Sequence, residues 1–147
     1  MTIHKLNDEN ATNEKQVGIV LVSHGNMAEA MLGAAEMVVG KMECCISVGL
    51  STSGGVDDGI EHIRDAVHKA DAGAGVLILT DLFGGTPTTL SLSMYKTDNI
   101  EVIAGANLPM VIKAMQQRDK MLKDLAADVK KAGRQGIVVA GEMLGRR

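Results

Sequence analysis

Short runs of apolar residues recur along this chain, and they predict its strands. Residues 18–22 are the clearest run, and similar runs occupy 44–50, 75–80 and 100–104. A continuous apolar run of this length is typical of a strand that is buried on both faces of a parallel sheet. The pattern therefore predicts four strands of this kind.

Between these runs, apolar residues recur every three or four positions, which predicts helices with one buried face. The first such series is Met27, Met31, Ala34, Ala35 and Val38, and Gly40 is a suitable residue to end it. Further helices are predicted from about 57 to 67, from Pro87 to about Tyr95, after Asn107 and Pro109, and over 121–131. Thr86 followed by Pro87 predicts an N-cap with proline at the first helical position.

Strands that alternate with helices through short glycine-bearing turns specify an α/β fold with an open, mainly parallel sheet flanked by helices. A last short strand is predicted over 137–140, framed by Gly133 and Gly136. It follows a long helix and does not fit the alternation. The sequence pattern alone does not say which strand it pairs with.

The 147 residues are expected to form one domain over 17–147, preceded by a polar stretch, 1–16, that we interpret as a flexible leader or a remnant of cloning. Aliphatic residues, alanine and ten methionines supply the core, because Phe83 and Tyr95 are the only aromatic residues. The net charge of -3, with no cluster of Lys or Arg, argues against a nucleic-acid partner. No run approaches the ~20 apolar residues of a membrane-spanning helix.

Two adjacent cysteines, Cys44 and Cys45, are the only thiols. Neighbouring positions on a strand point to opposite faces, so an ordinary disulfide between them is not expected, and two ligands do not make a metal site. We interpret them as small core side chains. Free thiols suit a reducing cytoplasm.

The candidate chemistry lies where the predicted strands end, in the turns 23–25, 81–86 and 105–107. In open α/β sheets, ligands bind at the carboxyl ends of the strands. If the first and third strands are neighbours whose connections leave on opposite sides, His24 and Asp81 face each other. A carboxylate beside an imidazole accepts the Nδ1 proton and leaves Nε2 with a free lone pair. His24 is then a nucleophile or a general base.

The glycines in these turns indicate which kind of ligand and reaction the site suits. Gly25, Gly84 and Gly85 allow backbone N–H groups to approach an anion, and Thr86 adds a hydroxyl. A histidine beside such amides, with no Lys or Arg in the turns, favours a phosphoryl group carried on the imidazole. Motifs for bound nucleotides are absent from the sequence, and so is the G-x-S-x-G elbow of a serine hydrolase.

Three segments resemble one known family. They are Val-Ser-His-Gly-Asn-Met-Ala-Glu-Ala around His24, Leu-Thr-Asp-Leu-Phe-Gly-Gly-Thr-Pro around Asp81, and Ala-Gly-Ala-Asn-Leu-Pro-Met around Asn107. The chain is similar over roughly 17–140 to the enzyme IIA component of the mannose-type family of the bacterial sugar phosphotransferase system (PTS). Three motifs in the right order make the resemblance specific, whereas Ser23-His24 alone would be a weak signal.

The resemblance implies a mechanism and an assembly. The carrier protein HPr passes a phosphoryl group to Nε2 of His24, and His24 passes it to a histidine-bearing IIB component and so toward a membrane permease (IIC and IID) and its sugar. Asp81 matches the residue that orients the imidazole, and Thr86 matches a hydroxyl residue that contacts the phosphoryl group. The family's strand order is 2-1-3-4, and its members are cytoplasmic homodimers whose antiparallel C-terminal strand pairs with the partner's sheet. This exchange would account for the strand predicted over 137–140.

Other interpretations of the same residues remain open. The phosphoryl-transfer subunit of dihydroxyacetone kinase has a similar outline, but it carries a different turn at the position of Asp81. A regulatory module that uses phosphorylation of His24 only as a signal is a second alternative.

Phe83 is a candidate docking contact for HPr or IIB. His62 and His68 are interpreted as solvated helix residues, Asn107 as a helix cap or a site residue, and no metal or other cofactor is expected.

Overall fold

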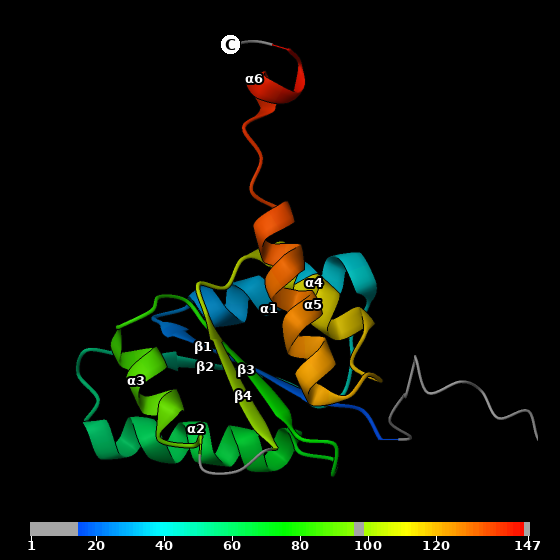
Figure 1. The fold of residues 1–147 in the computed structure, drawn as a ribbon. Helices are drawn as coiled ribbons and strands as arrows, with labels where there is room; N and C mark the ends of the chain where they lie inside the picture. Colours follow the sequence, from blue (N-terminus) through cyan, green and yellow to red (C-terminus); the bar gives the residue numbers. More distant parts are fainter. Residues whose placement is uncertain (1–14, 96–98, 146–147) are drawn as a thin grey trace, which may run out of the picture.

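A computed structural model describes residues 15–95 and 99–145 of the protein (Figure 1). β1 (Gly18–His24) is one of the two inner strands of its sheet. Residues 1–14, most of the predicted leader, lie outside the described part. The remaining elements are α1 (Met27–Val39), β2 (Cys45–Leu50), α2 (Val56–Ala70), β3 (Val76–Thr80), α3 (Thr86–Leu92), β4 (Ile100–Ala104), α4 (Leu108–Gln116), α5 (Leu122–Gln135) and α6 (Ala140–Met143).

The four strands form one parallel sheet in the order β2-β1-β3-β4, which confirms the predicted order and direction. Val22 of β1 lies opposite Val48 of β2 on one side and Thr80 of β3 on the other. All four strands run in the same direction, but the chain continues from β1 to the neighbour on one side and from β3 to the neighbour on the other. The loops that follow β1 and β3 therefore lead to helices on opposite faces, α1 on one and α3 on the other. This is the position at which open α/β sheets place their ligands.

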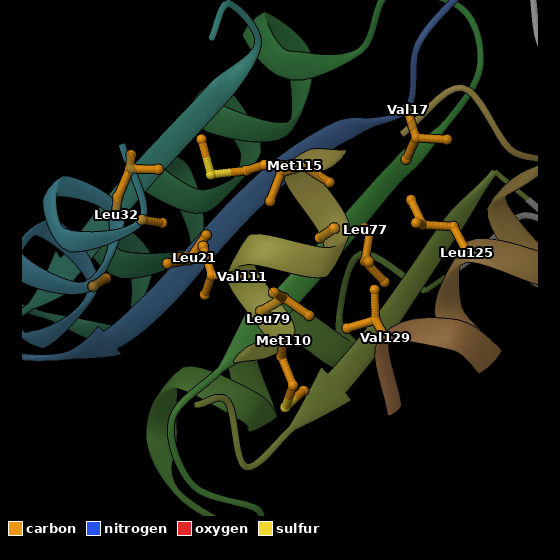
Figure 2. Packing of buried hydrophobic residues seen from close by; sticks show 14 of the residues in the cluster. Val17, Leu21, Leu32, Leu77, Leu79, Met110, Val111, Met115, Leu125 and Val129 are labelled. Atoms are coloured by element: carbon orange, nitrogen blue, oxygen red, sulfur yellow. The ribbon is translucent and has the colours of Figure 1, made fainter. Parts of the chain in front are cut away.

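Alternate residues of the central strands enter two separate hydrophobic cores. The helices α1, α4 and α5 cover one face and α2 and α3 the other (Figure 1). On the first face, Leu21, Leu77 and Leu79 pack against the three helices, as Figure 2 shows. On the second face, Val22 and Ile78 pack beneath α2 and α3. Burial on both faces explains why these strands have continuous apolar sequences.

Both predicted boundaries of α3 are wrong, and local contacts explain why. α3 ends at Leu92 rather than near Tyr95, because the hydroxyl of Ser93 and its backbone amide both bond to the carbonyl of Leu90. The N-cap of α3 is Gly85, and Thr86 is its first residue rather than its cap.

At the other end of the chain, α5 runs to Gln135, beyond the predicted end at residue 131. Gly133 therefore lies inside α5 instead of framing a strand. A Cβ at this position would lie 2.5 Å from Cγ of Met110, so the missing side chain lets α4 and α5 approach closely.

The strand predicted over 137–140 is not formed within the described chain. Residues 137–139 are without regular structure, and Ala140 begins the short helix α6. This segment extends away from the body of the domain (Figure 1), and Ile137 is 77% exposed. A strand needs a partner edge for its backbone N–H and C=O groups, and the described chain places none beside this segment.

Candidate functional site

His24 and Asp81 meet at the carboxyl edge of the sheet. His24 is the last residue of β1, and Asp81 directly follows β3. Oδ2 of Asp81 lies 2.7 Å from Nδ1 of His24 and also accepts the backbone N–H of His24 at 2.8 Å. The His24 side chain is 55% exposed, whereas that of Asp81 is 10% exposed. The structure therefore brings together an accessible ring and a largely buried carboxylate.

The environment of Asp81 keeps its carboxylate ionised. Burial alone would favour the neutral form, but the hydrogen bonds from the backbone and ring of His24, together with the charge of that ring, outweigh it. The pKa of Asp81 is consequently lower than its ordinary value. An ionised Asp81 accepts the Nδ1 proton and directs the lone pair of Nε2 outward.

Gly85 makes room for the imidazole ring. A Cβ at Gly85 would lie 2.9 Å from Cε1 and 3.5 Å from Nε2 of His24, so the ring lies against the backbone at the start of α3. Any side chain larger than hydrogen at this position would push the ring aside.

The predicted anion-binding glycines have different surroundings. The amide of Gly25 donates to the carbonyl of Leu50, and that of Gly85 donates to the carbonyl of Leu82. These two N–H groups hold the turns in place. Gly25 (φ +54°) and Gly84 (φ +84°) both have the left-handed backbone that glycine adopts readily.

Thr86 and Phe83 lie at the surface, Phe83 in the turn between Asp81 and α3 and Thr86 at the start of α3. The Thr86 hydroxyl forms no hydrogen bond within the described residues, and the backbone N–H of this first helical residue has no partner inside α3. Phe83 is 80% exposed, and Leu82 and Met27 beside this edge are also exposed. Phe83 is thus an exposed aromatic residue in the same turn as Asp81.

The site contains buried hydroxyl groups that the sequence analysis missed. Thr88 donates to the carbonyl of Leu82 and is bonded to the hydroxyl of Thr80, each at 2.6 Å, which braces the turn after β3. Ser23 accepts the amide of Ala28 at 2.7 Å and is buried. Only the position of these residues beside the turns could have suggested their roles.

The remaining candidates do not join the site. Asn107 caps α4 by accepting from the amide of Met110, and its side-chain N–H donates to the carbonyl of Gly133 on α5. His62 and His68 are exposed on α2.

Within 15–95 and 99–145, no group of three His, Cys, Asp or Glu side chains gathers as a metal site. In the same ranges, no helix has the length and apolar character to cross a membrane.

Comparisons with known proteins agree with one another. Residues 18–132 match the family model described as the PTS system fructose IIA component. The chain is 28% identical over 130 residues to the fructose-specific EIIA component of Bacillus subtilis, which covers 87% of this chain and 89% of that protein. It is 32% identical over 124 residues to the mannose-specific EIIAB component of Escherichia coli K12. That match covers 82% of this chain but only 38% of the relative's length.

A solved structure resembles the fold closely. The mannose/sorbose-specific IIA subunit of Enterococcus faecalis superposes with a TM-score of 0.77 at 28% identity, over 85% of this chain and 95% of that one. The match extends over most of the described elements.

Proposed function

The chain belongs to the mannose-type enzyme IIA family of the sugar phosphotransferase system, and from this membership we propose that it carries a phosphoryl group on Nε2 of His24. The observation that carries the proposal is the pairing of His24 with Asp81. Nδ1 lies 2.7 Å from a carboxylate oxygen of the largely buried Asp81, while the His24 side chain is 55% exposed. A group in this arrangement can accept a phosphoryl group from one protein and present it to another.

The proposed transfer makes one bond and breaks another. The Nε2 lone pair of His24 attacks the phosphorus of the phosphohistidine of HPr, and the N–P bond to HPr breaks as the new N–P bond forms. Positive charge then develops on the His24 ring, and the ionised carboxylate of Asp81 stabilises it by accepting a hydrogen bond from the proton that stays on Nδ1. Reversal of these steps toward a histidine of the IIB component completes the relay and supplies the IIC and IID permease.

The residues at the start of α3 are proposed to contact the phosphoryl oxygens. The hydroxyl and the backbone N–H of Thr86 are available for this, and Gly84 leaves the approach open. Gly25 and Gly85 shape the site, because their own amides bond to backbone carbonyls.

We propose that Phe83 contacts HPr or IIB. The two free thiols support action in a reducing compartment, the cytoplasm.

We also propose a homodimer in which the segment 137–140 pairs with an edge of the partner's sheet. Ile137, Val138 and Val139 are exposed and apolar, and β2 and β4 each have one unpaired edge in the described chain. An added strand would satisfy both features at once. Truncation after Gly136 should shift the sedimentation coefficient to that of a monomer, and an unchanged profile would refute the exchange.

Incubation with phosphoenolpyruvate, enzyme I and HPr tests the carrier function. Wild-type protein should gain the mass of one acid-labile phosphoryl group. Subsequent addition of a IIB protein should remove the group, which distinguishes a carrier from a module that is phosphorylated only as a signal. The dihydroxyacetone kinase alternative predicts transfer to the nucleotide-bearing subunit of that kinase instead, and the PTS names of the relatives favour the first outcome.

A further inference from the structure

Two buried polar groups next to His24 each have one hydrogen-bonding capacity that the described protein does not use. Asp81 is bonded to His24 through Oδ2 alone, and its other oxygen, Oδ1, is buried without a partner. Ser23 is 2% exposed and its Oγ accepts from the amide of Ala28, but no acceptor for the Ser23 hydroxyl proton is found among the described residues. One group is an acceptor in need of a donor, and the other is a donor in need of an acceptor.

Both residues line the same small cavity, which has a volume of about 10 Å³. Its other walls are apolar: Leu21, Val22, Met27, Ala28, Met31, Leu79 and Ala106. This volume is on the order of that needed for a single water molecule. Because the pKa of Asp81 is lowered, the carboxylate is ionised, and a bare oxygen of a buried carboxylate is costly in free energy.

We propose that one ordered water molecule occupies this cavity, accepts the hydroxyl proton of Ser23 and donates to Oδ1 of Asp81. The water completes the hydrogen bonding of the carboxylate on the side away from His24. With both oxygens held, Asp81 cannot rotate away from the imidazole. Ser23 is thereby a positioning residue for His24, acting through the water and Asp81.

The water itself can be tested without any assay of transfer. A high-resolution crystal structure should show one water within about 2.5–3.0 Å of both Oδ1 of Asp81 and Oγ of Ser23. In solution, long-lived water should give cross-relaxation peaks to the methyl protons of Ala106 and Ala28. A direct hydrogen bond between Ser23 and Asp81, or a dry cavity, would overturn the proposal.

The positioning role rests on the proposed function and is tested with variants. Ala106→Val fills the cavity but leaves Ser23, its bond to Ala28 and Asp81 intact, whereas Ser23→Ala removes both the bond and the water. Each variant should slow phosphorylation of His24 by HPr about tenfold, as expected for loss of one hydrogen bond to a buried charge. Each should also shift the NMR resonance of the His24 Nδ1 proton.

A control separates this role from simple effects on folding. Ala104→Val adds the same volume two residues before Ala106 and outside the cavity, and it should leave the rate and the resonance unchanged. If Ser23→Ala slows transfer but Ala106→Val does not, Ser23 acts only by capping α1 and the proposal fails. If wild-type His24 is never phosphorylated, the proposed function fails, while the crystal and the Nδ1 resonance still decide the water.

Discussion

Two side chains of this protein carry a nucleophilic atom and lie beside a charged group, His24 beside a carboxylate and Cys45 beside a guanidinium. The two pairs differ in which member is buried. His24 is exposed and is bonded to the carboxylate of Asp81. Cys45 is half-buried, and its sulfur accepts an N–H of Arg118 at 3.4 Å. The pKa of Asp81 is lowered, whereas the pKa of Cys45 is raised, because burial outweighs the nearby guanidinium and Cys44 and Glu36 add to the increase.

The difference shows that a neighbouring charge does not by itself make a reactive site. In the His24 pair, the buried member is the partner, and the nucleophile faces solvent. In the Cys45 pair, the nucleophile shares the burial, and Arg118, only 4% exposed, also binds the carbonyls of Val17 and Glu43. Arg118 therefore links the residue before β1 to the loop before β2. The first pair is suited to chemistry and the second to structure.

The largest effect is expected from Asp81→Asn. The amide nearly preserves the size of the side chain, but it removes the negative charge that is proposed to stabilise the phosphorylated ring, and it can bind the wrong tautomer of His24. Phosphorylation by HPr should slow about a hundredfold or more, measured by rapid-quench kinetics. A rate close to that of the wild type would mean that the carboxylate is not part of the relay.

Arg118→Ala should damage the fold but spare the chemistry. It leaves the carbonyls of Val17 and Glu43 without donors, so the free energy of unfolding should fall by about 2 kcal/mol in urea denaturation. The rate of His24 phosphorylation in the folded variant should stay unchanged. The matched control, Arg134→Ala on the exposed side of α5, should alter the free energy of unfolding little. Equal losses in the two variants would contradict a structural role for Arg118.

Acid should weaken the wild type more steeply than Asp81→Asn. The folded protein holds the pKa of Asp81 below the unfolded value of about 3.9, so the unfolded state binds the proton first as the pH falls. The stabilisation from Asp81 is therefore fully present above the unfolded pKa and is lost as the pH falls through the folded pKa. Urea titrations over this range should show the two proteins converging, while Asp65→Asn, an exposed control on α2, should parallel the wild type. Parallel curves for Asp81→Asn would contradict the lowered pKa.

The smallest effect concerns the two thiols. Because burial raises the pKa of Cys45, less thiolate is present there at mildly alkaline pH, and iodoacetamide should modify Cys45 several-fold more slowly than Cys44. Mass spectrometry of the labelled peptides resolves the two rates. Faster modification of Cys45 would show that Arg118, and not burial, dominates the environment of its sulfur.

The sequence predicts the sheet well because the signal is local and strong. The branched apolar runs of β1 and β3 are buried on both faces, and glycine or proline marks most of the turns. The meeting of His24 and Asp81 follows from the expected neighbour relation of these strands. The exact start of α3 differs by one residue, because Gly85 caps it in an extended conformation and Thr86 enters the helix.

Features that depend on distant contacts were not predictable. Arg118 is a charged residue in a loop, and nothing in its neighbours indicates that it is buried against residues 101 and 75 positions away. The sequence pattern predicts that Ser23 belongs to a polar turn, but in the structure it is a buried residue of β1. The segment 137–140 has the apolar sequence of a strand, but the partner edge that would make it one is not supplied by its own described chain.

The most direct test of the account is the mass of the intact protein after incubation with phosphoenolpyruvate, enzyme I and HPr, compared between wild type and His24→Ala. The wild type should gain one acid-labile phosphoryl group, and the variant should gain none. Phosphorylation of His24→Ala at the wild-type level would place the acceptor on another residue and contradict the assignment of His24.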